Sequence, residues 1–194
     1  PLARGLVAFW LLNEGSGGKV FDCSGSNNAG VFYGNTSWSG GRFGTCLNFD
    51  GTGDYVDCGN STSLRITKQI TISFWVNPLL SGFVEAYGGI VCRVSGGSEY
   101  QNRILLQNNG RILSQLNIGG VSDNFFSTGV VAEGQWSHIV YIYDGINESY
   151  YINGKYDSSD SETGDISSAY DNLLIGVGQL GGSLNYYFNG RIDN

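Results

Sequence analysis

The stretch QITISFWVNP, residues 69–78, alternates apolar side chains with mostly polar ones. In a β-strand successive side chains point to opposite faces, so a period of two separates an apolar face from a mixed face. The stretch therefore predicts a strand with one face in a core and the other toward solvent. The apolar set is Ile70, Ile72, Phe74 and Val76, and the mixed set is Thr71, Ser73, Trp75 and Asn77.

Similar short segments follow one another along the whole chain, and none shows a long helical periodicity. Turn signals separate them, including DG at 144–145 and NG at 153–154 and 189–190. About a dozen strands without helices predict an all-β fold, an antiparallel β-sandwich or jelly roll, in one domain spanning residues 1–194. The expected strands include GLVAFWLL, DYVDCG, NRILLQ, GRILSQLNI, WSHIVYIYD, ESYYING and NLLIGVG.

The composition narrows the classes of function. The chain has 194 residues, 41% of them hydrophobic, which is enough for a sizeable core. Acidic residues outnumber basic ones 17 to 10, and the net charge of −7 would repel phosphate backbones, so we expect no nucleic-acid partner. No apolar run of about 18 residues occurs, so no membrane insertion is expected. These numbers leave the oligomeric state open.

His138, the single histidine, lies in the stretch WSHIVYIYDGINESYYING, residues 136–154. Period-2 alternation places it on a strand face with Trp136, Val140 and Ile142. A catalytic histidine needs a nucleophile to activate, and the motif G-x-S-x-G is absent. We therefore interpret His138 as a packing residue with no chemical role.

Seven segments occur in an order that resembles a known family: GLVAFWLLNEGSG, DCSGSNNAG, LNFDGTGDYVDCGN, ITISFWVNP, WSHIVYIYDG, YINGK and FNGRIDN. From Gly5 to Asn194 the chain resembles the laminin-G-like, concanavalin A-like lectin/glucanase jelly rolls. The resemblance implies two curved sheets face to face, a carbohydrate or extracellular protein ligand, a structural calcium ion, and a secreted or cell-surface location. In the family the FNGRIDN element usually runs on, so we expect a domain excised from a longer protein.

The same fold also hosts glycoside hydrolases, which need two carboxylates on one face. Asp54 and Asp57 would point to opposite faces of a strand. Asp160 and Glu162 have suitable spacing, but they lie in DSSDSETGD, residues 157–165, which we expect to be a polar loop. No suitable carboxylate pair is found, so we expect the protein not to be an enzyme.

A non-catalytic carbohydrate-binding module is the first functional hypothesis. Aromatic rings stack on sugar faces, and amides and arginine bind hydroxyl groups. Trp75 shares a polar strand face, although large aromatics are more often core residues. If the mixed faces of several strands lie together, they form one polar groove with an aromatic floor, made of Trp75, Arg103, Gln107, Gln115 and Asn117.

Protein adhesion is the second hypothesis, because laminin-G-like domains commonly bind proteins. Phe125 and Phe126, adjacent in the loop SDNFFSTG, are then either an exposed anchor or a hydrophobic plug under that loop. The sequence leaves both possibilities open.

A calcium site is expected in the loop DCSGSNNAG, because calcium prefers several oxygen ligands. The loop offers Asp22, Ser24, Asn27 and Asn28. The resemblance places it near the RIDN element and so adds Asp193, with Glu14 and Asp50 in reserve. The alternative is an Asx turn closed by the loop's own backbone.

The four cysteines form no C-x-x-C pair, so a zinc site is not supported. Cys23 in a loop and Cys46 at a strand start are the expected disulfide, since both lie near one end of the sandwich in the family layout. Cys58 and Cys92 are either core thiols or a second bridge.

Overall fold

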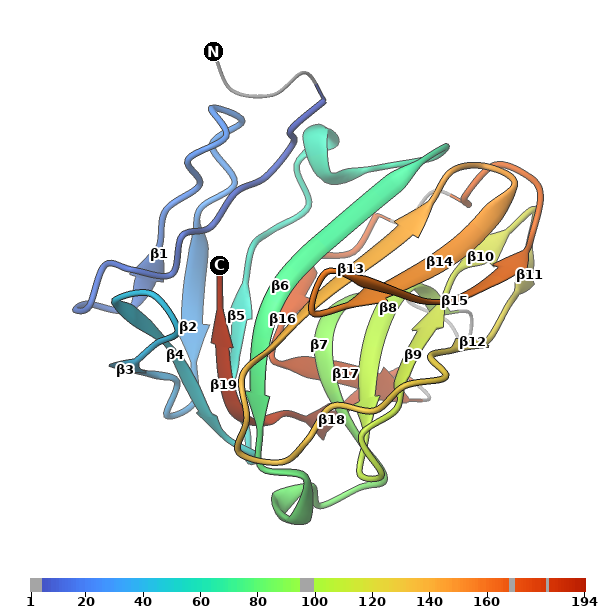
Figure 1. The fold of residues 1–194 in the computed structure, drawn as a ribbon. Helices are drawn as coiled ribbons and strands as arrows, with labels where there is room; N and C mark the ends of the chain where they lie inside the picture. The colour runs from blue at the N-terminus through green and yellow to red at the C-terminus, as the bar shows by residue number, and fades with distance from the viewer. Residues whose placement is uncertain (1–4, 95–99, 168–169, 181) are drawn as a thin grey trace.

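Two antiparallel sheets pack face to face in the computed structural model, which describes residues 5–94, 100–167, 170–180 and 182–194 (Figure 1). The sandwich predicted from the sequence is thereby confirmed. In spatial order, the eight-stranded sheet consists of β1 (Lys19–Val20), β2 (Gly30–Tyr33), β5 (Tyr55–Asp57), β16 (Leu173–Ile175), β7 (Tyr87–Val94), β8 (Tyr100–Gln107), β9 (Ile112–Gln115) and β12 (Phe125–Phe126). The seven-stranded sheet consists of β15 (Lys155–Ser161), β14 (Asn147–Ile152), β13 (Ser137–Tyr143), β6 (Ile70–Pro78), β19 (Asn189–Asp193), β4 (Thr45–Asp50) and β3 (Ser37–Gly40).

The core lies between the sheets, where the apolar strand faces meet. Phe74 and Val76 of β6 are buried in it, whereas Trp75 between them points away, as the alternation predicts. Phe49 and Phe188 meet there edge to face, with ring centroids 6.1 Å apart. Burial of such rings, roughly 150–250 Å² each, supplies much of the stabilisation of a sandwich core.

A hairpin formed by β17 (Val177–Leu180) and β18 (Ser183–Tyr187) lies on the outer face of the eight-stranded sheet, the face turned away from the core. It approaches β7 very closely, because a Cβ atom on Gly89 would lie 2.1 Å from the backbone nitrogen of Gly178. The glycine at position 89 is therefore what allows the hairpin to cover this part of the sheet.

Two expectations about individual segments were wrong. The apolar run at residues 5–12 forms only an isolated bridge, between Trp10 and Asp22. Its Trp10 and Leu12 side chains pack in the core, and its Phe9 amide donates to the Asp22 carboxylate and not to a neighbouring strand. Residues 155–161, expected mostly as loop, form the edge strand β15 beside β14. An exposed edge strand tolerates polar side chains, so the Ser- and Asp-rich composition did not prevent pairing.

The remaining elements are small. A hairpin of β10 (Asn117–Ile118) and β11 (Val121–Ser122) and two short 3-10 helices, η1 (Thr62–Leu64) and η2 (Leu80–Gly82), complete the secondary structure of the described residues. None of the helices in this part of the chain has the length and apolar character that a bilayer crossing requires.

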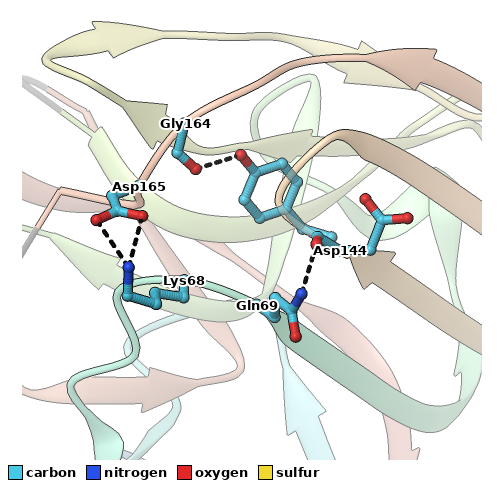
Figure 2. A network of polar contacts seen from close by, with 6 residues as sticks. Lys68, Gln69, Asp144, Gly164 and Asp165 are labelled. Atoms are coloured by element: carbon cyan, nitrogen blue, oxygen red, sulfur yellow. Dashed lines mark hydrogen bonds and ion pairs between the residues drawn. The ribbon is translucent and has the colours of Figure 1, made fainter.

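Polar contacts join three neighbouring segments, the loop after β15, the end of β13 and the start of β6, as Figure 2 shows. The Tyr143 hydroxyl donates to the Gly164 carbonyl at 2.6 Å, and Gln69 Nε2 donates to the Asp144 carbonyl at 2.7 Å. Lys68 and Asp165 form an exposed ion pair at 3.3 Å, of a kind that contributes about 0–1 kcal/mol. The buried tyrosine contact is thus the stronger attachment of this loop.

Candidate functional site

The five residues expected to form one groove lie in different places. Trp75 is on β6 of the seven-stranded sheet, and Arg103 is on β8 of the eight-stranded sheet. Their strand neighbours Phe74 and Ile104 point into the core, so Trp75 and Arg103 point outward on opposite sides of the sandwich. The prediction of a single groove with Trp75 as its floor is therefore wrong. The sequence correctly separated the outward faces of β6 and β8 from their core faces. It did not show that these two strands belong to different sheets.

Arg103 and Gln115 lie under the β17–β18 hairpin and hold it in place. Arg103 Nε donates to Gln115 Oε1, and its Nη1 donates to the carbonyl of Gln179 on β17. The Arg103 guanidinium also lies 5.8 Å from the ring centroid of Tyr186 on β18. Both side chains are buried, so the predicted polar face exists but the hairpin covers this part of it.

The other two amides of the expected groove also have structural partners. Gln107 Nε2 donates to the Tyr87 hydroxyl at 3.1 Å. Asn117 is 1% exposed, and its Oδ1 accepts from the Gly120 amide and the Ser167 hydroxyl. Asn117 therefore stabilises the turn of the β10–β11 hairpin and is not accessible to a ligand.

Beside the hairpin, the outer face of the eight-stranded sheet remains open as a groove of about 380 Å³, which we call the Tyr55 groove. β5 and β16 form its floor, the hairpin forms one wall, and the segment 170–172 forms another. Its lining residues are Tyr55, Asp57, Asn60, Tyr170, Asp171, Asn172, Leu174, Gln179 and Leu184.

The Tyr55 groove combines an aromatic surface with hydrogen-bonding groups held in place. The Tyr55 ring stacks on Tyr33, with centroids 4.6 Å apart and planes 1° apart. Asp57 accepts from Asn172 Nδ2 at 2.8 Å and from the Gly59 amide at 2.8 Å. Asn60 Nδ2 donates to the Tyr170 carbonyl at 2.9 Å. Rings and oriented amide and carboxylate groups together suit a polyhydroxylated ligand.

Sequence reasoning missed this groove, although part of its signal was visible. The segment DYVDCG was recognised as a strand, and its alternation places Tyr55 and Asp57 on one face, opposite the buried Val56. Asp57 was considered only as half of a catalytic pair with Asp54. The contribution of residues 170–184 depends on chain segments that meet only in the folded protein.

A larger cavity, about 730 Å³, lies beside residues 5–9, and an apolar one of about 180 Å³ extends from the same region toward the core. Aliphatic side chains such as Leu6, Val7, Ile66, Ile70 and Ile142 dominate the larger one. Six of its fourteen lining residues have side chains that can hydrogen-bond, against seven of nine in the Tyr55 groove. The smaller Tyr55 groove is therefore the more polar of the two and the better site for a polar ligand.

Trp75 belongs to a separate patch on the seven-stranded sheet. Phe43, 53% exposed, packs edge-on against it with centroids 5.6 Å apart, and the Arg42 guanidinium lies 5.1 Å from the Trp75 ring centroid. The His138 ring lies 5.0 Å from Trp75 on the other side. We call these four residues the Trp75 patch.

His138 has a partner that the sequence did not suggest. Its Nε2 lies 2.9 Å from the Ser73 hydroxyl, and partial burial lowers the pKa of the imidazole from 6.5. No hydrogen bond joins the His138 ring to a carboxylate among the residues that the structure describes. The ring therefore lacks the acid that orients a catalytic histidine, and the packing interpretation accounts for its contacts with Ser73 and Trp75.

The loop expected to bind calcium is organised around Asp22. This carboxylate accepts hydrogen bonds from the amides of Phe9, Ser24 and Asn28, at 2.8–2.9 Å, and these bonds lower its pKa while partial burial opposes them. Amide N–H groups that point at a carboxylate do not coordinate a cation. These hydrogen bonds use three of the roughly four acceptor positions of the Asp22 carboxylate, and the bonds from Ser24 and Asn28 have the geometry of the Asx-turn alternative.

Of the other expected calcium ligands, Asn28 and Asp193 accept hydrogen bonds from the protein, Ser24 donates one, and Asn27 is exposed. Asn28 Oδ1 accepts from the Ser61 and Ser63 hydroxyls, and Ser24 donates to the Val7 carbonyl. Asn27 is exposed in the left-handed conformation, with φ 62°. Asp193 is buried, and burial raises its pKa while the amides of Arg42 and Phe43 donate to its Oδ2.

The reserve ligands Glu14 and Asp50 accept from the amides of Phe21 and Thr52. No cluster of three or more metal-ligating side chains occurs in the described part of the chain. Calcium binding remains a prediction.

The expected disulfide between Cys23 and Cys46 is not formed, and all four cysteines are free thiols. Cys46 points to the outer face of β4 and donates to the Gly40 carbonyl at 3.3 Å, whereas Cys23 is exposed in its loop. Burial raises the pKa of Cys46 to about 11 and that of Cys92 to about 12. Of the two possibilities for Cys58 and Cys92, the structure has buried thiols.

Phe125 and Phe126 lie on a strand, β12, and not in a loop. Phe125 is buried and stacks on Tyr150 with centroids 4.9 Å apart. Phe126 packs against the cluster around Leu105. The plug interpretation is therefore correct, and the pair is not an exposed anchor.

The chain matches a known family over about three quarters of its length. A laminin G family model described as Concanavalin A-like lectin/glucanases superfamily matches residues 50–194. No curated protein matches the chain.

Solved structures share the fold at low sequence identity. The binding domain of Paraclostridial Mosquitocidal Protein 1 is 17% identical, with a TM-score of 0.75 over 97% of this chain and 47% of that one. Domain 4 of AbnA, a GH43 extracellular arabinanase from Geobacillus stearothermophilus in complex with arabinotriose, is 20% identical, with a TM-score of 0.65 over 89% of this chain and 82% of that one. Mouse laminin α1 domains LG4-5 are 15% identical, with a TM-score of 0.56 over 76% and 39%. The chain thus spans about half the length of the mosquitocidal binding domain.

Proposed function

Because the chain belongs to the laminin G family of the concanavalin A-like lectin/glucanases superfamily, we propose that it is a non-catalytic glycan-binding module of a secreted or cell-surface protein. The proposed ligand is a glycan segment in the Tyr55 groove. Fold membership alone does not assign a ligand, so the proposal rests on the groove.

One observation carries it: the groove joins the Tyr33–Tyr55 stack to the hydrogen-bonded pair of Asp57 and Asn172. A sugar has an apolar face for an aromatic ring and hydroxyl groups for carboxylate and amide oxygens. Similarity to an arabinanase domain seen with arabinotriose supports a sugar ligand as an analogy of fold.

The positions of the carboxyl groups with raised pKa values support a non-catalytic role. A glycosidase acid needs a raised pKa beside the scissile bond. Burial raises the pKa of Asp54, Glu148 and Asp193, and none of these lines the Tyr55 groove. Asp54 is fully buried, and both of its oxygens accept backbone amides, from Asn35 and Asp50.

Protein adhesion is the second candidate function, and the Trp75 patch is the observation that favours it. An exposed phenylalanine beside a tryptophan and an arginine has the composition of a binding hot spot. The two candidates use opposite sides of the sandwich, so separate substitutions can test them.

A glycan array followed by calorimetry tests the proposal. Tyr55→Ala should weaken binding of the strongest array ligand about tenfold, since ring contacts of this kind contribute about 0.5–1.5 kcal/mol in addition to burial. Trp75→Ala is the matched control, because it removes an aromatic ring from the opposite outer face and should leave glycan affinity unchanged. Circular dichroism checks that both variants fold.

Two outcomes would reject the glycan proposal. One is the absence of binding to any glycan by the wild-type protein. The other is loss of glycan binding in Trp75→Ala together with unchanged binding in Tyr55→Ala, which would assign the site to the Trp75 patch. Hydrolysis of a bound oligosaccharide would contradict the non-catalytic part.

A further inference from the structure

We propose that the Tyr55 groove selects uncharged glycans and rejects glycans that carry carboxylate or sulfate groups, with Asp57 and Asp171 setting this preference. The inference rests on the proposed function and adds the chemical class of its ligand. It follows from the charges around the groove, which are independent of the aromatic stack.

Two carboxylates line the groove, and no lysine or arginine does so among the described residues. Asp57 lies on its floor, between Tyr55 and the walls formed by later segments. Its Oδ1 accepts the Gly59 amide and its Oδ2 accepts Asn172 Nδ2. Each carboxylate oxygen can accept a second hydrogen bond, so a sugar hydroxyl can still donate to Asp57.

Three arginines in the described part of the chain interact with lining residues without lining the groove themselves. Arg103 Nη1 donates to the Gln179 carbonyl, and the buried Arg93 interacts electrostatically with Asp171. Arg65 Nη2 donates to the Asn60 carbonyl at 3.1 Å, and its guanidinium lies 5.0 Å from the Tyr170 ring centroid. Arg65 therefore contacts two lining residues without lining the groove itself. Arg93 offsets part of the Asp171 charge, but no cation lines the groove among the described residues. A ligand carboxylate would therefore meet two carboxylates in the lining, on a chain whose net charge is −7.

The size of the effect follows from Coulomb's law. Two like charges at about 5 Å in an environment close to water repel enough that two such contacts weaken binding about tenfold. Hydroxyl groups carry no such penalty, because they donate to the same carboxylates. The repulsion acts across solvent, so salt should reduce it.

The test compares a neutral oligosaccharide with its own acid. The probe is the strongest ligand among neutral oligomers of glucose, galactose, mannose, xylose and arabinose. Its partner is the same oligomer with primary hydroxyls oxidised to carboxylates, or the corresponding uronate oligomer if the ligand is a xylose oligomer. The acid should bind about tenfold more weakly at low salt, and 0.5 M sodium chloride should narrow the difference.

The double variant Asp57→Asn/Asp171→Asn should bind the acid more tightly than the wild type does. Asparagine keeps one acceptor oxygen at each position, but at Asp57 it replaces the acceptor of either the Gly59 amide or Asn172 Nδ2 with an NH2 group. The readout is therefore the ratio of neutral-sugar to acid affinity within the variant, which should fall toward one, and circular dichroism checks that the variant folds. The matched control is Asp160→Asn, a single charge removed from the exposed edge strand β15, which should leave the selectivity unchanged.

The outcomes separate the two proposals. If no oligosaccharide binds, the glycan function fails and the selectivity falls with it. If neutral and acidic forms bind equally well, or the acid binds more tightly, the glycan function stands and the selectivity is wrong. Unchanged discrimination in the double variant would also overturn the roles of Asp57 and Asp171.

Discussion

Glu148 makes the stability of this fold depend on pH in a direction that the structure specifies. Its side chain is fully buried on β14, where the Tyr141 hydroxyl donates to Oε1. Burial raises the pKa of this carboxyl from 4.5 to about 8, although the Tyr141 hydrogen bond opposes the shift. The folded state therefore holds a proton on Glu148 under conditions in which the unfolded chain has released it.

The sign follows from this difference in bound protons. The stabilisation is fully present below the unfolded pKa of 4.5 and is lost as the pH rises through the folded pKa of about 8. Between these values the free energy of unfolding should fall by about 1.4 kcal/mol per pH unit, which amounts to about 3 kcal/mol from pH 5.5 to pH 8. His138 acts in the opposite direction, because burial lowers its pKa from 6.5 and its contribution grows as the pH rises.

Urea unfolding, followed by tryptophan fluorescence at several pH values, measures this slope. Glu148→Gln keeps the shape and an acceptor for Tyr141 but cannot titrate, so its stability should fall less steeply than that of the wild type. The contribution of His138 is common to both proteins and cancels in the difference. Glu85→Gln, at an exposed position, should follow the wild type. Identical slopes for the wild type and Glu148→Gln would refute the reasoning.

Three further predictions concern the hairpin, the Asp22 loop and the thiols. Gly89→Ala should lower the free energy of unfolding by about 1–3 kcal/mol, because its Cβ would overlap the β17 backbone. Gly18→Ala, where a Cβ meets no atom within 4 Å, is the control for the urea midpoint. Asp22→Ala should lower the free energy of unfolding by about 1–3 kcal/mol, because three backbone amides lose their acceptor, and the loss should be the same in calcium and in chelator. A loss that is larger in calcium would support a metal site in this loop. Thiol titration should find Cys23 reactive in the native protein and all four thiols after unfolding without reductant; fewer than four would indicate a disulfide.

The local pattern of the sequence was sufficient for the fold class and for the face of each strand. Alternation on β6 placed Phe74 inside and Trp75 outside, as observed. The same alternation on β13 put His138 and Ile139 on different faces, but it did not show which face is buried; in the structure that is the Ile139 face. This information is local, because the direction of a side chain depends only on its position in the pleat.

Tertiary structure alone decided which strands share a sheet and what covers them. Trp75 and Arg103 have similar mixed surroundings in the sequence, yet β6 and β8 lie in opposite sheets and a hairpin covers Arg103. The Tyr55 groove likewise joins residues 55–60 to residues 170–184. Pairing and covering depend on contacts between segments distant in the chain, and a period of two along one strand carries no information about which strand lies beside it.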